Sequence, residues 1–172
     1  MDTHEHFMDE ALGEARLALQ DGEFPVGCVM VADGAVMARG RRQHTRAGQC
    51  NEIDHAEVLT LRSLLAEHPE FDMGRLTVYS TMEPCLMCYA TLLLSGIRSF
   101  VWAYEDVMGG GTSLPLEQLN PLYAAMRVRL LGRVRRSQSL LLFQQFFRTG
   151  TYWSDSLLAR YTLSQPVESS AP

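Results

Sequence analysis

Two short motifs, one at residues 55–57 and one at residues 84–88, constrain the fold of this chain more than any other feature. The first reads His-Ala-Glu and the second Pro-Cys-Leu-Met-Cys, and each opens a stretch with helical apolar periodicity. A β-rich apolar run separates them. Cys85 and Cys88 are three residues apart, so on a helix they share one face and can hold one ion. A fold that uses both motifs together has to place the starts of two helices side by side.

Length and composition narrow the class of protein. The 172 residues suffice for one domain with a hydrophobic core and are too few for two ordinary domains. No apolar run reaches the roughly 18 residues of a membrane span. The acidic N-terminus lacks the basic and apolar regions of a signal peptide. We therefore expect a cytoplasmic protein with no membrane partner. The net charge of −5 argues weakly against a dedicated nucleic-acid binder.

Apolar periodicity and turn signals predict alternating helices and strands. Helices are expected at residues 5–21, 55–67, 85–95, 117–126 (interrupted at Pro121) and 138–147, with a short one at 154–160. Strands are expected at residues 26–32, 35–38, 76–80, 98–104 and 128–131, with a polar loop at 39–54. A hairpin turn at Asp33-Gly34 followed by βα alternation predicts an α/β fold, with a mixed sheet and helices on both faces. We expect one domain at residues 1–150 and a partly disordered C-terminal extension at 151–172.

The motif residues suit a catalytic zinc site. Cys85 and Cys88 lie in the opening turns of a helix, where the helix dipole favours the thiolate that a metal binds. Pro84 fits the first helical position, where its missing N–H costs nothing. His55 supplies a third ligand, and three ligands leave one tetrahedral position open for water. His55 and Glu57 can converge only if His55 precedes the regular helix. Glu57 can then move a proton between the water and a leaving group.

Other interpretations of the cysteines and the motifs remain open at this stage. The Cys85–Cys88 pair alone could be a redox pair, and the whole set could form a zinc-containing binding module without turnover. Cys28 is expected to be buried and inert, whereas Cys50 lies in the arginine-rich loop and could approach the zinc. The joint pattern favours the zinc-deaminase arrangement, in which a water on zinc attacks the carbon that carries an amino group.

With these residues in hand, the chain resembles the cytidine-deaminase-like superfamily, and within it the branch that holds tRNA adenosine deaminases and guanine deaminases. The resemblance spans roughly residues 7–147 and rests on the runs at 24–29, 55–57, 81–88 and 95–98. It implies a three-layer α/β/α sandwich with a mixed five-stranded sheet. It also implies one Zn²⁺ per subunit, Glu57 as general acid/base, and a homodimer.

The resemblance also implies substrate contacts. Zinc goes to His55, Cys85 and Cys88, while the backbone at Ala56 and Cys85 helps to hold the base and the hydroxyl. Val26, Pro84 and Glu83 fall near the substrate, and Glu83 could equally tie down a loop. Arg42 stands where tRNA-editing and guanine-deaminase members carry an asparagine that touches the substrate. The tail also lacks the basic helix of the tRNA enzymes, so both departures weaken the transfer of a tRNA substrate.

The leading hypothesis is hydrolytic deamination of a nucleobase, nucleoside or nucleotide. The alternative is conversion of adenosine to inosine in a tRNA anticodon loop. Two arginine stretches, at 39–46 and 127–136, keep an anionic substrate in consideration, although they could also pair with the acidic remainder of the chain. Tyr152 and Trp153 could close over a pocket or pack on a partner subunit.

Overall fold

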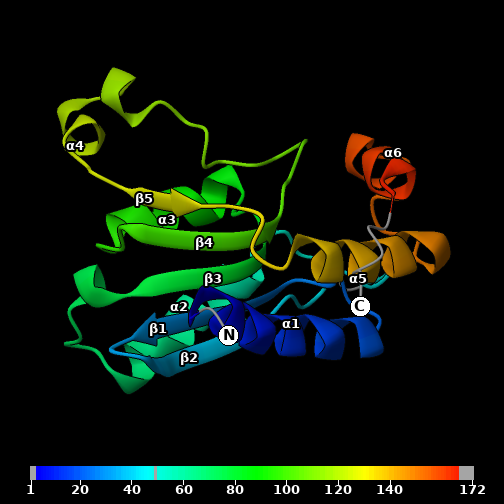
Figure 1. The fold of residues 1–172 in the computed structure, drawn as a ribbon, viewed down its shortest axis with the longest axis horizontal. Coiled ribbons are helices and arrows are strands. Elements are labelled where there is room, and N and C mark those ends of the chain that lie inside the picture. Colours follow the sequence, from blue (N-terminus) through cyan, green and yellow to red (C-terminus); the bar gives the residue numbers. More distant parts are fainter. Residues whose placement is uncertain (1–2, 49, 167–172) are drawn as a thin grey trace.

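A mixed five-stranded sheet forms the centre of the computed structural model, which describes residues 3–48 and 50–166 (Figure 1). The strand order is β2-β1-β3-β4-β5. The strands are β1 (Gly27–Ala32), β2 (Ala35–Arg41), β3 (Thr77–Met82), β4 (Ser99–Tyr104) and β5 (Arg129–Leu131). Strand β1 runs antiparallel to β2 and β3, whereas β3, β4 and β5 are parallel. The predicted mixed sheet is confirmed.

The β1–β2 hairpin turns at Asp33 and Gly34, whose φ angles of 51° and 78° match the two-residue turn expected for this pair. Strand β2 continues to Arg41, so the prediction that a loop begins at Arg39 was wrong. Gly27 pairs with Arg41 and Val29 with Arg39, and this ladder extends the strand. Because β2 is an edge strand, its end can carry arginines, and these give no apolar pattern by which the strand could be predicted.

Helices cover both faces of the sheet, which confirms the three-layer α/β/α sandwich. Helices α1 (Thr3–Gln20) and α5 (Arg136–Thr149) contact each other and lie on one face. Helices α2 (Ala56–Glu67) and α3 (Leu86–Leu94) contact each other on the opposite face (Figure 1). Both apolar surfaces of β1 are therefore buried, as its six consecutive buried residues show.

The segments between β4 and the C-terminus depart from the predicted boundaries. Instead of one helix at 117–126, the chain forms a 3₁₀ turn at Leu116–Gln118 and the short helix α4 (Pro121–Ala124). Pro121 begins α4, because proline suits the first turn of a helix. A further 3₁₀ turn spans Met73–Arg75. None of the helices in the described part of the chain is long and apolar enough to cross a membrane.

Helix α6 (Leu157–Ser164) packs on α5. It begins three residues later than the predicted range 154–160, because the Ser156 hydroxyl, and not Ser154, accepts the backbone N–H of Ala159. The Gln144 side chain donates to the carbonyls of Thr162 and Gln165 at 3.1 and 2.8 Å. These bonds hold residues 151–166 against the sandwich, and the frayed end expected near residue 172 lies outside the described residues.

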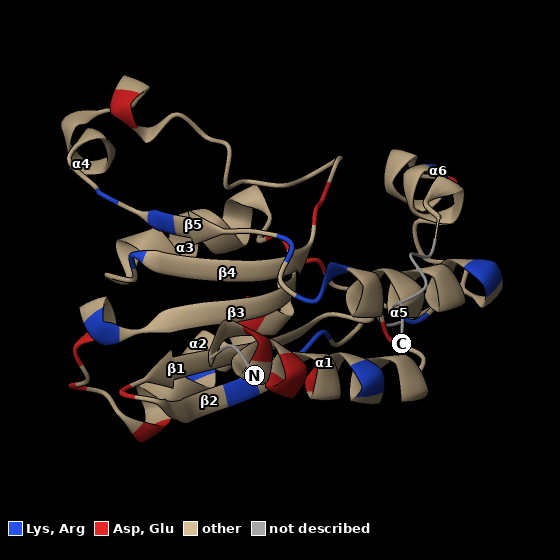
Figure 2. Cartoon of the chain, viewed as in Figure 1, with Lys and Arg blue, Asp and Glu red and all other residues tan. Residues whose placement is uncertain are grey.

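The first arginine stretch is paired with carboxylates from the acidic remainder of the chain. Figure 2 marks the positions of the basic residues in blue and the acidic residues in red. Carboxylates lie within 4 Å of every arginine in it: Arg39 with Glu10 and Glu14, Arg41 with Glu14 and Asp21, Arg42 with Glu52, and Arg46 with Glu23. In the second stretch, Arg135 pairs with Glu5 and Asp9, and Arg136 pairs with Glu105. The two stretches could have contacted an anionic substrate or paired with the acidic remainder of the chain. Most of their arginines form ion pairs with that remainder.

Candidate active site

The two motifs meet at the starts of α2 and α3, on the same side of the sheet. His55 is the residue before α2, with φ −67° and ψ 150°, and Cys85 is the residue before α3, with φ −66° and ψ 168°. Both backbones are extended, so His55 and Glu57 converge as expected although they are only two residues apart. Pro84 lies one position before the cap residue Cys85, which corrects its predicted place inside the first turn.

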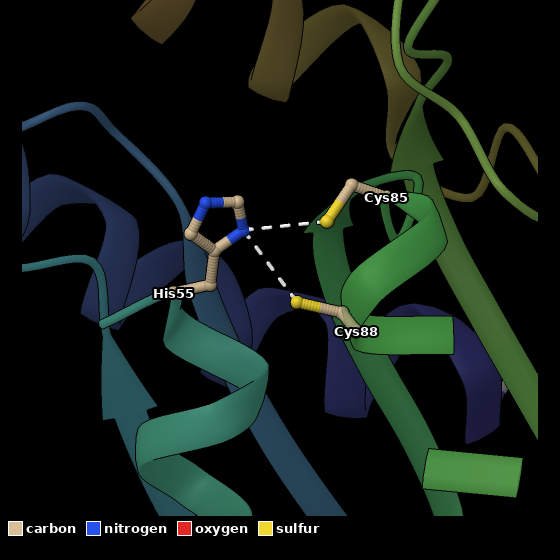
Figure 3. A group of neighbouring side chains, drawn as sticks. All are labelled: His55, Cys85 and Cys88. Carbon is tan, nitrogen blue, oxygen red and sulfur yellow. Dashed lines mark hydrogen bonds between the residues drawn. The ribbon is translucent and has the colours of Figure 1, made fainter. Parts of the chain in front are cut away.

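His55, Cys85 and Cys88 form a group able to hold a metal ion (Figure 3). The Nδ1 atom of His55 lies 3.5 Å from the Sγ atom of each cysteine, and the candidate ligand atoms all lie within 4.8 Å of one another. One imidazole and two sulfurs are the donor set of a catalytic zinc with one open position. Among the described residues, Cys50 lies outside this group and donates to the carbonyl of Thr45.

The electrostatics of the group favour a thiolate. A hydrogen bond from Cys88 lowers the pKa of the Cys85 thiol to about 4, and the same pairing raises the pKa of Cys88. Burial lowers the pKa of His55, but hydrogen bonding to Cys85 and the charge of Glu57 outweigh it and raise the value. The lowered pKa of Cys85 favours its thiolate, which is the form that a metal binds.

Glu57 lies in the first turn of α2 and is 3% exposed. Its Oε1 accepts the Ser80 hydroxyl at 3.0 Å, and its Oε2 accepts the Cys88 thiol at 3.5 Å. Burial raises the pKa of this carboxyl group. Ser80, on strand β3, therefore fixes one oxygen of Glu57 while the other faces the metal group. The sequence analysis did not single out Ser80, because a serine in a buried strand has no local motif.

A cavity of about 160 Å³ opens beside these residues. His55, Glu57 and Cys85 line it, together with the predicted substrate contacts Val26, Ala56, Glu83 and Arg42. Pro84 is buried and does not line it; its carbonyl accepts the N–H of Gly111 at 2.9 Å. The C-terminal segment contributes Tyr152, Trp153 and Leu158 to the wall. Of the two roles considered for the aromatic pair, the structure therefore places both rings at the pocket of their own chain.

Glu83 ties down the loop that follows β4. Its carboxylate accepts the backbone N–H of Asp106 at 3.2 Å and the hydroxyl of Thr112. A Cβ atom on Gly110 would lie 2.7 Å from the Glu83 carboxyl carbon, so this loop approaches Glu83 as closely as glycine allows. Glu83 borders the cavity and also fixes the loop whose residues Asp106, Met108 and Gly109 line it.

Arg42 is 3% exposed, and both terminal nitrogens of its guanidinium donate hydrogen bonds. It donates to the carbonyls of Gln43 and Asn51 at 2.7 and 2.8 Å, and to Glu52 and the Tyr152 hydroxyl at 3.3 and 3.4 Å. Glu52 also lies 3.8 Å from the Nε2 atom of His55. Glu52 was not predicted as a site residue; the one available signal was an acidic residue three positions before the histidine.

Comparisons with known proteins agree with this geometry. The family described as the cytidine and deoxycytidylate deaminase zinc-binding region matches residues 1–104. The tRNA-specific adenosine deaminase of Agrobacterium fabrum is 31% identical over 144 residues, which cover 83% of this chain and 93% of that protein. A solved structure from a study of tRNA:A34 deaminases is 28% identical with a TM-score of 0.65, covering 80% of this chain and 98% of the other.

A second kind of deaminase shares the fold. The structure of guanine deaminase from Bacillus subtilis is 28% identical with a TM-score of 0.54, and the match covers 61% of this chain and 66% of the other. The matched family region contains both motifs, and its zinc-binding character agrees with the imidazole and two sulfurs found at the starts of α2 and α3. The chain therefore belongs to the cytidine and deoxycytidylate deaminase family of zinc-dependent hydrolases.

Proposed function

We propose that the protein hydrolyses the exocyclic amino group of a single purine or pyrimidine base, supplied as free base, nucleoside or nucleotide, and releases ammonia. The observation that carries this proposal is the cavity, which the chain's own C-terminal segment walls on one side. Its volume of about 160 Å³ is below the roughly 300–1,000 Å³ of sites that take drug-sized ligands. A pocket of this size takes a single base, the unit on which the proposed hydrolysis acts.

The proposed roles follow from the contacts. His55, Cys85 and Cys88 hold zinc, which when bound lowers the pKa of water to about 7. Glu57, oriented by Ser80, accepts a proton from the attacking water and returns it to the amino group, which leaves as ammonia while the water oxygen stays on the base. Val26 and Ala56 contact the base from the cavity wall. Glu83 acts mainly through the loop that it holds.

The test is ammonia release from a panel of adenine, guanine, cytosine and their nucleosides and nucleotides. Glu57→Ala should keep one zinc per chain and the native fold, yet lower kcat by on the order of 10²–10⁴-fold, because the proton shuttle is lost. A Ser63→Ala variant, at a half-buried position of the same helix that does not line the cavity, should match the unmodified protein. Equal activity of Glu57→Ala would contradict the catalytic role. Full zinc occupancy without ammonia release from any compound or tRNA would instead support a non-catalytic zinc-containing module.

Deamination of adenosine in tRNA is the second candidate. It is supported by relatives named as tRNA-specific adenosine deaminases and by exposed Arg129 and Arg133 beside the sheet edge. Incubating the protein with a tRNA pool and sequencing for A-to-G changes separates the two candidates. Changes at one anticodon adenosine, with no ammonia from the small-molecule panel, would favour tRNA. Silence across the pool would favour the small substrate.

We further propose a homodimer that works in the cytoplasm. Exposed leucines on α3, α4 and β5 support the dimer, since large apolar side chains gain free energy when they are buried between two copies. They are Leu86, Leu94, Leu122, Leu130 and Leu131. The free thiols support the compartment, because Cys85 and Cys88 have to stay reduced to hold a metal.

A further inference from the structure

The imidazole of His55 is contacted on both of its nitrogen atoms. Nδ1 faces the two cysteine sulfurs, as Figure 3 shows. Nε2 faces the other way and lies 3.8 Å from Oε2 of Glu52. A metal-binding histidine whose second nitrogen meets a carboxylate is held in one tautomer and one ring orientation, and becomes a stronger ligand.

Glu52 is itself held in place, although its side chain is 56% exposed. The Tyr152 hydroxyl lies 2.9 and 2.8 Å from its two carboxylate oxygens. The Arg42 guanidinium, which is buried and anchored on two backbone carbonyls, donates to Oε2 at 3.3 Å. A carboxylate fixed from two sides loses little conformational freedom when it meets a third partner.

Tyr152 brings the C-terminal segment into this arrangement. Its ring packs edge-on against Phe24 with centroids 5.5 Å apart, and Phe24 in turn contacts Phe143, Phe146 and Phe147 of α5. Helix α6, which follows Tyr152, is tied to α5 through the Gln144 amide. A continuous set of contacts therefore runs from the docked C-terminal segment to the imidazole.

We propose that Glu52 is a positioning residue for His55, held in place by Tyr152, so that docking of the C-terminal segment strengthens metal binding at the active site. The inference rests on zinc ligation by His55 as proposed above. It goes beyond that proposal because it assigns to residues 150–166 a role in metal affinity in addition to a role in closing the pocket.

The experiment measures zinc affinity of the full chain by competition with a chromogenic chelator, which requires no substrate. Glu52→Ala should weaken zinc binding by roughly 10–100-fold, the range found when such outer partners are removed. Tyr152→Phe, which removes only the hydroxyl, should weaken it by a smaller factor. Glu52→Asp should recover part of the loss. Glu67→Gln, which removes a carboxylate at the far end of α2, is the matched control and should bind zinc like the unmodified protein.

A double variant shows whether Tyr152 acts through Glu52. Glu52→Ala with Tyr152→Phe should bind zinc no more weakly than Glu52→Ala alone, and Co²⁺ loaded in place of zinc should report a changed absorption spectrum in every Glu52 variant. Zinc affinity of Glu52→Ala within twofold of the unmodified protein would overturn the inference, as would additive losses in the double variant. If the unmodified protein itself bound no stoichiometric zinc, the ligand assignment of the proposed function would fail first.

Discussion

At the scale of the residue, Gly27 shows how tightly the sandwich is closed. A Cβ atom there would lie 2.2 Å from the Ala11 carbonyl oxygen and 2.5 Å from the Ala15 nitrogen of α1. Gly27→Ala should therefore destabilise the fold by roughly 2–4 kcal/mol, because backbone rather than a flexible side chain blocks the new methyl group. Gly13→Ala, whose Cβ meets nothing within 4 Å, should instead stabilise α1 by about 0.5–1 kcal/mol. Urea unfolding measures both, and equal effects would contradict the packing argument.

Some residues of the site are positioned by the spacing within a short motif, and others by segments distant in the sequence. The placement of His55, Glu57, Cys85 and Cys88 in one group could be predicted, because it follows from helix geometry at the two motifs. Glu52 could not, since its contact with His55 also depends on a tyrosine 100 residues later in the chain. Arg42 was placed at the pocket by resemblance alone, and its bonds to backbone carbonyls depend on the path of the intervening loop.

At the scale of the element, Glu105 joins β4 to both C-terminal helices. Arg136 of α5 donates to it at 2.8 Å and Tyr161 of α6 also at 2.8 Å. Burial would raise the pKa of Glu105, but these hydrogen bonds outweigh burial and lower it to about 2. Because the folded pKa lies below the ordinary value of 4.5, the carboxylate stabilises the fold above about pH 4.5, and this contribution is lost as the pH falls toward 2.

Glu105→Gln should therefore lower the free energy of unfolding at pH 7 by roughly 1–2 kcal/mol, allowing for solvent screening. The difference from the unmodified protein should shrink when urea unfolding is repeated near pH 3. Glu117→Gln, at an exposed position, should change neither value. A Glu105→Gln difference that stays constant between pH 7 and pH 3 would show that the charge of this carboxylate contributes nothing.

Helices and strands could be predicted where burial requires apolar residues in the sequence. Strands β1 and β4 are largely apolar because both of their faces are covered, and β3, which is equally buried, still carries residues of high β-propensity in Val78, Tyr79 and Thr81. The end of β2 and the start of α6 were misplaced for opposite reasons. Strand β2 ends in Arg39 and Arg41, whose place in the strand follows from backbone pairing with β1 and not from apolar side chains. For α6, serines at 154 and 156 are equally good caps in sequence, and packing on α5 selects the second.

At the scale of the whole molecule, the cavity is assembled from both ends of the chain. Phe24 and Val26 come from the segment before β1, His55, Glu57 and Cys85 from the middle of the chain, and Tyr152, Trp153 and Leu158 from the C-terminal segment. The family match ends at residue 104, so the last part of the wall lies beyond the region that defines the zinc chemistry. Substrate choice can therefore vary through the C-terminal segment while the metal group stays unchanged.

A second feature of the whole molecule is the set of exposed leucines on α3, α4 and β5. Leu94 is 58% exposed and Leu122 is 62% exposed, and covering such side chains on association recovers about 25 cal/mol for each Å² of apolar area. Light scattering after gel filtration should give twice the mass of one chain, and the double variant Leu94→Glu, Leu122→Glu should give the mass of a monomer. Leu17→Glu, at an exposed leucine of α1 on the other face of the sheet, carries a similar change and should remain a dimer. A double variant that keeps the mass of a dimer would place the interface elsewhere. An unmodified protein with the mass of one chain would contradict the proposed dimer.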